Sequence, residues 1–231
     1  MLPVAILAGG LATRLRPITE KIPKALLPVA GEPFIYHQLR YLQQQGIEKV
    51  TLCIGYLGEM IEATVGDGRQ FGLRVTYSPD GPQLLGTGGA LKQALPLLGE
   101  EFFVLYGDSF LPIDFAAVQG TFLQSGKPAL MTVLRNGDRW DKSNVFFRDG
   151  KVEEYNKRVP RADMEFIDYG LGILSQFVFD SYYPGQPFDL ADLYHALSLE
   201  GNLVGHEVYE RFYEIGSLRG LEETETYFLR T

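Results

Sequence analysis

The chain has little cysteine, no excess of positive charge and no long apolar run. Cys53 is its only cysteine, so a disulfide within the chain is excluded, and its apolar neighbours predict a thiol that fills the core. A net charge of −8 argues against a nucleic-acid-binding protein, which would need a broad basic surface. No stretch of about 18 apolar residues occurs, and the first residues lack the basic segment of a signal peptide. A cytoplasmic location is the resulting expectation.

Internal repeats, low-complexity segments and linkers are also absent. The first half alternates between strand and helix patterns instead. Strands are expected at Val4–Leu7, Lys49–Ile54, Leu73–Tyr77 and Glu101–Tyr106, and helices from Pro33 to Gly46, at Gly58–Val65 and at Gly89–Leu98. Strands separated by helices predict an α/β fold with a Rossmann-like, mostly parallel sheet and helices on both faces.

The second half has a different pattern. Extended segments are expected at Ala129–Leu134, Asn144–Tyr155, Met164–Leu174 and Phe212–Ile215, the second of them a hairpin that turns at Asp149-Gly150. One helix is expected at Asp189–Leu199 with Asp189 as its N-cap, and Ser217 should cap a last helix that ends near Leu229. We expect one domain over residues 1–231.

The richest motif directly follows the first strand. Leu7-Ala8-Gly9-Gly10 forms a glycine-rich turn, in which main-chain N–H groups can approach a phosphate that a Cβ atom would keep away. Four cations follow within eleven residues, with Glu20 as the only acid among them: Arg14, Arg16, Lys21 and Lys24. A local basic loop on an acidic protein suits a small polyanion, although a solvated surface loop would have the same charges.

This stretch resembles the sugar-phosphate nucleotidylyltransferases, whose signature runs roughly L-A-G-G-x-G-T-R-L-x-P-L-T-x-x-x-P-K-P. Residues 7–25 match it with two small-residue departures, Ala12 for Gly and Ala25 for Pro. The resemblance continues at Gly86–Ala90, Leu105–Asp108 and Phe212–Gly216, and so covers nearly the whole chain. It implies the nucleotide-diphospho-sugar transferase type of fold, in a short form similar to mannose or heptose guanylyltransferases and N-acetylmuramate uridylyltransferases.

The resemblance also implies a reaction. A nucleoside monophosphate passes from a nucleoside triphosphate to a sugar 1-phosphate, with Mg²⁺ as cofactor and pyrophosphate as second product. Such transfer needs positioning and charge neutralisation more than covalent chemistry. Arg14, Lys24 and Asp108 are the expected catalytic residues, the two cations holding the triphosphate. The residues expected to bind the nucleotide are Leu7, Ala8, Gly9, Gly10, Thr13, Gln83, Gly86 and Thr87.

Two acidic residues are candidates for Mg²⁺. Asp108 ends an apolar strand, so its carboxylate should emerge at the edge where open α/β sheets bind ligands, unless it caps a turn. Glu214 stands where the family usually has Asp. It could reach the metal directly or through a water, or could instead pair with a nearby cation such as Arg211 or Arg219.

The sugar phosphate is expected at the second half of the chain. By resemblance Asn144, Lys157 and Asp168 would bind it, Lys157 gripping the phosphate and Asp168 contacting hydroxyl groups. A surface lysine and a turn-capping aspartate are the structural alternatives. Residues 1–125 would then form mainly the nucleotide-binding half and residues 126–231 mainly the sugar-phosphate half.

Two other functions remain open at this point. The chain could be a cytidylyltransferase for a non-sugar alcohol phosphate, or a nucleotide-sugar sensor without catalysis, although a sensor would not need Arg14, Lys24 and Asp108. The expected partners are small-molecule substrates, with neither nucleic acid nor membrane. The sequence leaves the nucleobase, the sugar and the oligomeric state undetermined.

Overall fold

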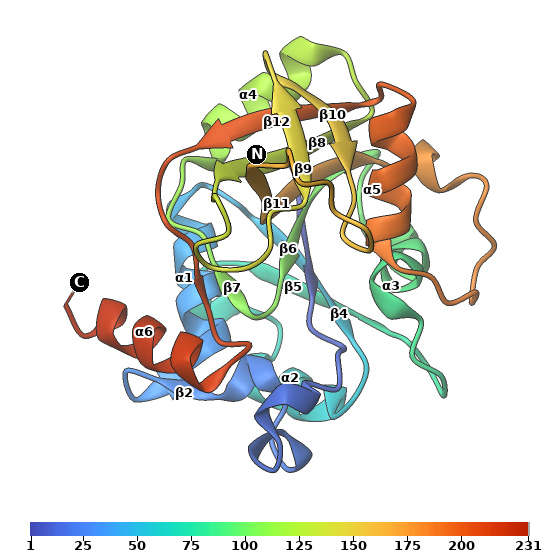
Figure 1. Cartoon of the computed structure of the whole chain (residues 1–231). Coiled ribbons are helices and arrows are strands. Elements are labelled where there is room, and N and C mark those ends of the chain that lie inside the picture. Colours follow the sequence, from blue (N-terminus) through green and yellow to red (C-terminus); the bar gives the residue numbers. More distant parts are fainter. Residues whose placement is uncertain (231) are drawn as a thin grey trace.

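The computed structural model describes residues 1–230 and has at its centre a nine-stranded sheet (Figure 1). Its strands are β1 (Val4–Leu7), β4 (Lys49–Ile54), β5 (Arg74–Pro79), β6 (Glu101–Tyr106), β8 (Ala129–Arg135), β9 (Val145–Arg148), β10 (Lys151–Tyr155), β11 (Phe166–Ser175) and β12 (Leu203–Val208). Two small ladders join β2 (Pro28–Val29) to β3 (Glu32–Pro33) and β7 (Ser109–Phe110) to β13 (Tyr213–Glu214). The α-helices are α1 (Phe34–Gln44), α2 (Gly58–Val65), α3 (Gly86–Ala94), α4 (Phe115–Ser125), α5 (Leu190–Leu199) and α6 (Leu218–Phe228).

The sheet is mixed, which corrects the expectation of a mostly parallel one. Its order is β5-β4-β1-β6-β11-β8-β12-β10-β9, in which β5, β4, β1 and β6 form a parallel block and β12 also pairs with β8 in parallel. β11 lies antiparallel between β6 and β8, and β9 pairs with both β10 and β11. The cause is connectivity: no helix separates β8, β9, β10 and β11, so a parallel crossover is not available to them.

Helices cover both faces of the sheet, as the alternating pattern predicts. One hydrophobic core joins one face to α1, α2 and α4, and a second joins the other face to α3 and α5. A third, smaller cluster packs the segment after β1 against α6 and β7, through Leu15, Leu27, Phe110 and Ile215 among others. The basic loop near the N-terminus is therefore held in place by the last helix of the chain.

Most predicted elements are confirmed within two or three residues. The strands at β1, β4 and β6 and the helix α2 have the predicted bounds, and the hairpin turns at Asp149-Gly150, between β9 and β10. Asp189 and Ser217 cap α5 and α6 with their side chains. The sequence prediction misses α4, β12 and the two-residue strands β2, β3 and β7. No helix in residues 1–230 is long and apolar enough to cross a membrane.

The carboxyl ends of the parallel strands meet at one edge of the sheet. Main-chain hydrogen bonds continue past the strand ends, from Gly107 N–H to the carbonyl of Leu7 at 2.9 Å and from Asp80 N–H to the carbonyl of Ile54 at 2.9 Å. The segments that follow β1, β5 and β6 therefore remain in register, and they bring their polar residues to a common edge.

Candidate functional site

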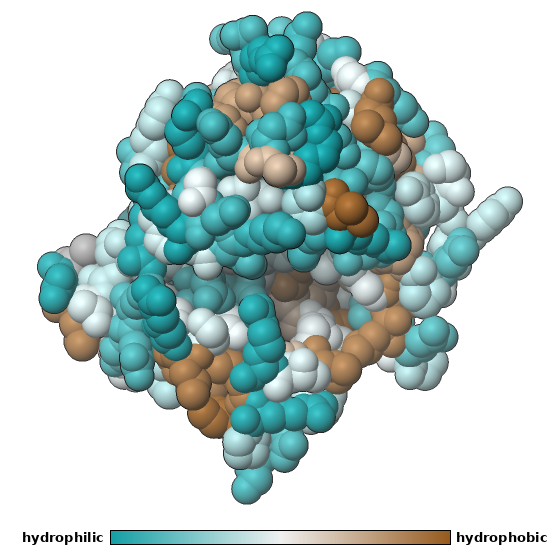
Figure 2. Space-filling model, in the orientation of Figure 1, coloured by the Kyte–Doolittle hydropathy of each residue, from teal (hydrophilic) through white to brown (hydrophobic). Residues whose placement is uncertain are grey.

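Two adjoining cavities open at this edge, and Tyr106 and Asp108 line both of them. Figure 2 shows the molecule hollowed near the centre of this face, with hydrophobic surface inside the hollow and hydrophilic side chains above it. The cavity volumes are about 250 Å³ and 510 Å³, so the pair suits two small ligands that meet at a shared wall.

The first cavity is lined mainly by small and apolar residues. Its wall consists of Leu7, Ala8, Gly9, Gly10, Ala12, Lys24, Ala25, Cys53, Asp80, Leu84, Gly86, Thr87, Ala90, Tyr106, Gly107 and Asp108. Cys53 is buried, as predicted, and burial raises the pKa of its thiol to about 12, so it stays protonated at neutral pH.

The two glycines of the first motif have different surroundings. A Cβ on Gly9 would lie 3.0 Å from the main-chain nitrogen of Gly55, so the close approach of two loops favours glycine there. Gly10 has no positive φ, and a Cβ there would meet nothing within 4 Å. The packing of the protein therefore does not require glycine at position 10, which lines the first cavity. Ala12, where the family has Gly, has φ 48°, the left-handed conformation that glycine adopts most easily.

The glycines of the second motif are packed against another segment. Gly86 has φ +70°, and a Cβ on it would lie 2.7 Å from the carbonyl oxygen of Phe188. Side chains on Gly88 would overlap with the ring of Phe188 itself. The N–H groups of Gly88 and Gly89 donate to the Phe188 carbonyl at 3.0 Å and 3.3 Å. These glycines therefore fit the start of α3 to the chain before α5, and Gly86 also lines the cavity.

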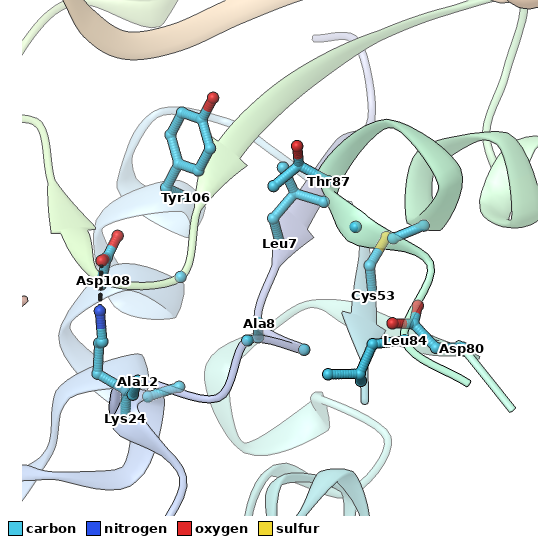
Figure 3. Close-up of a pocket in the computed structure, with 16 residues that line it drawn as sticks. Leu7, Ala8, Ala12, Lys24, Cys53, Asp80, Leu84, Thr87, Tyr106 and Asp108 are labelled. Atoms are coloured by element: carbon cyan, nitrogen blue, oxygen red, sulfur yellow. Dashed lines mark hydrogen bonds and ion pairs between the residues drawn. The ribbon is translucent and has the colours of Figure 1, made fainter. Parts of the chain in front are cut away.

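An ion pair stands at the shared wall. Lys24 Nζ donates to Asp108 Oδ2 at 2.8 Å, and the two side chains are 18% and 28% exposed (Figure 3). The neighbouring Ser109 hydroxyl donates to Asp108 Oδ1 at 3.3 Å. Both groups of the pair still face the cavities, so a phosphate could replace Asp108 as the partner of Lys24.

The second cavity is lined mainly by polar and charged residues. These are Arg14, Tyr106, Asp108, Ser109, Arg139, Trp140, Asp141, Asn144, Tyr155, Lys157, Ile167, Asp168, Tyr169, Gly170, Arg211, Phe212, Glu214, Ser217, Arg219, Gly220 and Glu223. Arg211 and Arg219 both pair with Glu223. Arg14, Arg139 and Lys157 form no ion pair among residues 1–230, so their charges are available to an anion.

Asp168 and Asn144 are joined in the wall of this cavity. Asn144 Oδ1 accepts the main-chain N–H of Asp168 at 3.0 Å, and Asp168 Oδ1 accepts the N–H of Gly170 at 3.0 Å. Burial raises the pKa of the Asp168 carboxyl to about 6, against a smaller opposing effect of the Gly170 N–H and of the Lys157 charge. Asp168 is thus partly a turn cap, as one reading of the sequence suggested, and also a hydrogen-bonding group of the cavity.

Glu214 does not pair with Arg211 or Arg219. Its carboxylate accepts the main-chain N–H of Gly216 and, at 3.0 Å, the hydroxyl of Ser217, just before α6. Its strand β13 pairs with β7, and the N–H of Ile215 donates to the carbonyl of Asp108 at 2.9 Å. Asp108 and Glu214 therefore lie on neighbouring main-chain segments, and both line the second cavity.

The carboxylate of Asp108 is a suitable ligand for Mg²⁺. Magnesium is usually held by one or two carboxylates together with substrate phosphates and water, and Asp108 offers such a carboxylate where the cavities meet. Within the described residues no group of three or more His, Cys, Asp or Glu side chains could hold a metal by itself. A metal here would depend on substrate oxygens, and each carboxylate oxygen of Glu214 already accepts one hydrogen bond, from Gly216 or from Ser217.

Most predicted site residues are brought together. Of the predicted residues, those that line the first cavity are Leu7, Ala8, Gly9, Gly10, Lys24, Gly86, Thr87 and Asp108, and those that line the second are Arg14, Asp108, Asn144, Lys157, Asp168 and Glu214. Thr13 and Gln83 are exposed and line neither cavity. Arg14 faces the second cavity, although it was expected beside the triphosphate.

Several wall residues were not predicted as site residues, among them Asp80, Tyr106, the loop of Arg139 to Asp141, and Arg211. Asp80 and Tyr106 each lie at the carboxyl end of a parallel strand, a signal that could have identified them. The other two lie in loops whose sequence carries no comparable signal.

Comparison with known proteins agrees with this geometry. The family model described as nucleotidyl transferase matches residues 4–142. The chain is 33% identical to a D-glycero-alpha-D-manno-heptose 1-phosphate guanylyltransferase from Campylobacter jejuni over 178 residues, 77% of each protein. It is 44% identical to an N-acetylmuramate alpha-1-phosphate uridylyltransferase from Neisseria meningitidis over 113 residues, which span 48% of this chain and about half (49%) of that relative.

A solved structure extends the likeness to the whole fold. HddC from Yersinia pseudotuberculosis, complexed with GMP-PN, has a TM-score of 0.80 and 25% identity over 99% of this chain and 100% of that one. The resemblance seen in the motifs is thus confirmed, and the similarity of fold covers nearly the whole chain. The chain belongs to the nucleotidyl transferase family and is a sugar-phosphate nucleotidylyltransferase.

Proposed function

We propose that this enzyme transfers a nucleoside monophosphate from a nucleoside triphosphate in the first cavity to a sugar 1-phosphate in the second. The observation that carries the proposal is the meeting of two unlike cavities at Asp108. A small, largely apolar wall with exposed main chain suits a nucleoside. A polar wall with unpaired cations suits a phosphorylated sugar. All residues of the first wall lie in the proposed nucleotide-binding half, residues 1–125.

The proposed reaction needs no protein nucleophile. A phosphate oxygen of the sugar 1-phosphate attacks the α-phosphorus, a new P–O bond forms, and the bond from the α-phosphorus to the bridging oxygen of pyrophosphate breaks. Lys24 and Arg14 would neutralise the phosphate charge on the two sides of Asp108. Lys24 would exchange Asp108 for a phosphate oxygen as the nucleotide binds. Bound Mg²⁺, with Asp108 and the proposed Glu214 as ligands, would supply charge neutralisation of the phosphates.

The sugar side of the proposal depends on three residues of the second half. Lys157 would hold the phosphate, while Asn144 and Asp168 would bind sugar hydroxyl groups. Because Asp168 has a pKa near 6, it is mainly a carboxylate at neutral pH and can accept a hydrogen bond from a hydroxyl. A sensor function is less well supported, since Arg14, Lys24 and Asp108 are all present at the cavity walls.

A substrate panel tests the proposal. The protein is incubated with Mg²⁺, each of GTP, UTP, dTTP, CTP and ATP, and glucose, mannose or N-acetylmuramic acid 1-phosphate, and pyrophosphate is measured. We expect pyrophosphate only when both substrates are present, and a loss of roughly 100-fold or more in the Asp108→Asn variant. Choline phosphate tests the non-sugar alternative. Pyrophosphate formation with choline phosphate alone, or normal turnover of the variant, would contradict the proposal.

A further inference from the structure

The helix α1 places one amide among the apolar residues of its buried face. The buried residues of this helix are Phe34, Ile35, Gln38, Leu39 and Leu42. Gln38 is 2% exposed, and a buried amide is costly unless its polar atoms form hydrogen bonds. Figure 1 shows α1 beside β7, the short strand that follows the turn of Asp108. The partners of the amide should therefore lie at this turn.

The amide of Gln38 binds two main-chain carbonyls, one on each side of Asp108. Its Nε2 donates to the carbonyl of Tyr106 at 3.0 Å and to that of Ser109 at 2.7 Å. Tyr106 ends β6 and Ser109 begins β7, so the two hydrogen bonds span the turn Gly107-Asp108. An amide nitrogen carries two hydrogens, which allows one for each carbonyl. One side chain therefore holds both ends of the turn that carries the carboxylate.

The other polar atom of this amide shows why a glutamine is present. Oε1 of Gln38 is buried and has no hydrogen-bond partner in residues 1–230. The reverse orientation of the amide would place this oxygen against the two carbonyls, which are also acceptors. Core filling alone would favour an apolar side chain, since a buried unsatisfied oxygen destabilises the fold. The turn, and not the packing of α1, therefore explains this residue.

The turn has a fixed place in the molecule. Main-chain hydrogen bonds of 2.9 Å attach it to the end of β1 and to the residue after β13, and Gln38 attaches it to α1. The carboxylate of Asp108 then lies 2.8 Å from Lys24 Nζ, at the wall that both cavities share (Figure 3). A shift of the turn would move this carboxylate relative to both substrates.

We infer that Gln38 is a positioning residue that fixes the carboxylate of Asp108 where the two substrates meet. Gln38 lines neither cavity, so it acts only through the turn. The inference rests on the proposed function, because that function makes Asp108 a catalytic residue. Transfer at the α-phosphorus depends on exact placement, and a displacement of about 1 Å can lower the rate roughly 100-fold.

Gln38→Met tests the inference, because methionine is unbranched and of similar size but has no N–H donor. With the active pair of substrates, we expect kcat to fall on the order of 10- to 100-fold and each KM to change less than about threefold. Gln45→Met is the matched control. The Gln45 side chain, just after α1, accepts the N–H of Phe115 at 3.0 Å and lines neither cavity. This control should lower the melting temperature and leave kcat unchanged.

Two further measurements separate positioning from folding. In the Asp108→Asn background, Gln38→Met should lower kcat less than about twofold, since a residue that acts through Asp108 has little effect once the carboxylate is gone. A crystal structure of Gln38→Met requires no turnover. It should show the turn Gly107-Asp108 displaced from α1 by about 1 Å or more.

Three results would overturn the inference: a normal kcat in Gln38→Met, an equally large loss in the Asp108→Asn background, or an unmoved turn in the crystal structure. A failure of the proposed function gives a different result. Normal turnover of Asp108→Asn would refute the catalytic role of Asp108, whereas a displaced turn in Gln38→Met would still show that Gln38 positions this residue.

Discussion

Among single residues, Asp168 has the most informative ionisation. Its pKa in the folded protein is about 6, above the 3.8 of an ordinary aspartate, because burial disfavours the carboxylate. Between these values the folded state binds more protons than the unfolded state, so the stability contribution of this group falls as pH rises from about 4 to 6 and then stays constant.

Asp168→Asn removes this dependence. The variant should therefore gain in melting temperature relative to wild type as pH rises from 4 to 6, with a constant difference from 6 to 8. Thermal denaturation of both proteins across this range measures the difference, in which the other titrating groups cancel. A difference that does not change with pH would refute the raised pKa.

A substitution of Glu214 tests whether this residue is a metal ligand. Its carboxylate is held by Gly216 and Ser217 at the start of α6, yet it lines the cavity that Asp108 also lines. If it becomes a metal ligand when substrates bind, Glu214→Gln should lose most activity and need severalfold more Mg²⁺ for half-maximal rate. A lower melting temperature with an unchanged Mg²⁺ requirement would instead identify Glu214 as a structural cap.

The site residues that could be predicted from the sequence belong to short local motifs. Lys24 and Asp108 belong to local motifs, and a motif can be read without knowing the fold. Asp80 belongs to no local motif. The signal that could have identified it, its position at the carboxyl end of β5, depends on β5, β4, β1 and β6 lying side by side. Gln83 was expected to bind the nucleotide, but it is exposed and does not line the cavity.

At the scale of elements, α3 and α4 offer a matched pair of glycines. A side chain on Gly88 in α3 would overlap with Phe188, whereas one on Gly120 in α4 would meet nothing within 4 Å. Gly120→Ala should stabilise the protein by roughly 0.5–1 kcal/mol through helix propensity. Gly88→Ala should destabilise it by about 1–3 kcal/mol, because α3 and the chain before α5 must separate.

Urea unfolding of both variants checks this contrast, and nucleotide affinity should fall only in Gly88→Ala, since α3 lines the first cavity. Equal stability changes in the two variants would mean that the contact between α3 and Phe188 is loose.

Most helices and strands could be predicted from the sequence, whereas the pairing of the strands could not. Hydrophobic periodicity and turn residues are local, so β1, β4, β6 and α2 were predicted with their observed bounds. The antiparallel position of β11 between β6 and β8 follows from contacts between segments tens of residues apart, and the strand pattern of β11 alone does not encode it. The mostly parallel sheet was therefore an extrapolation from the first half.

At the scale of the whole molecule, Lys24 lines the first cavity and Lys157 the second, so the proposed function assigns a different substrate to each lysine. Lys24→Ala should mainly raise the KM for the nucleotide or lower kcat, and Lys157→Ala should mainly raise the KM for the sugar phosphate. Each lost charge-assisted hydrogen bond should cost about 1.5–3 kcal/mol. Steady-state kinetics with each substrate varied in turn measures this, with Lys127→Ala, an exposed lysine outside both walls, as control. The same defect toward both substrates in both variants would contradict the division.

The central claim is that both substrates are held at once on either side of Asp108 and exchange one bond at the α-phosphorus. The most direct test of this claim uses a nucleoside triphosphate with ³²P at the α-position and determines which product carries the label. With the active sugar 1-phosphate and Mg²⁺, the label should pass entirely into a nucleotide sugar, with unlabelled pyrophosphate released in equal amount and no release when the sugar phosphate is omitted. Label that appears as free nucleoside monophosphate, or stays attached to the protein, would contradict the account.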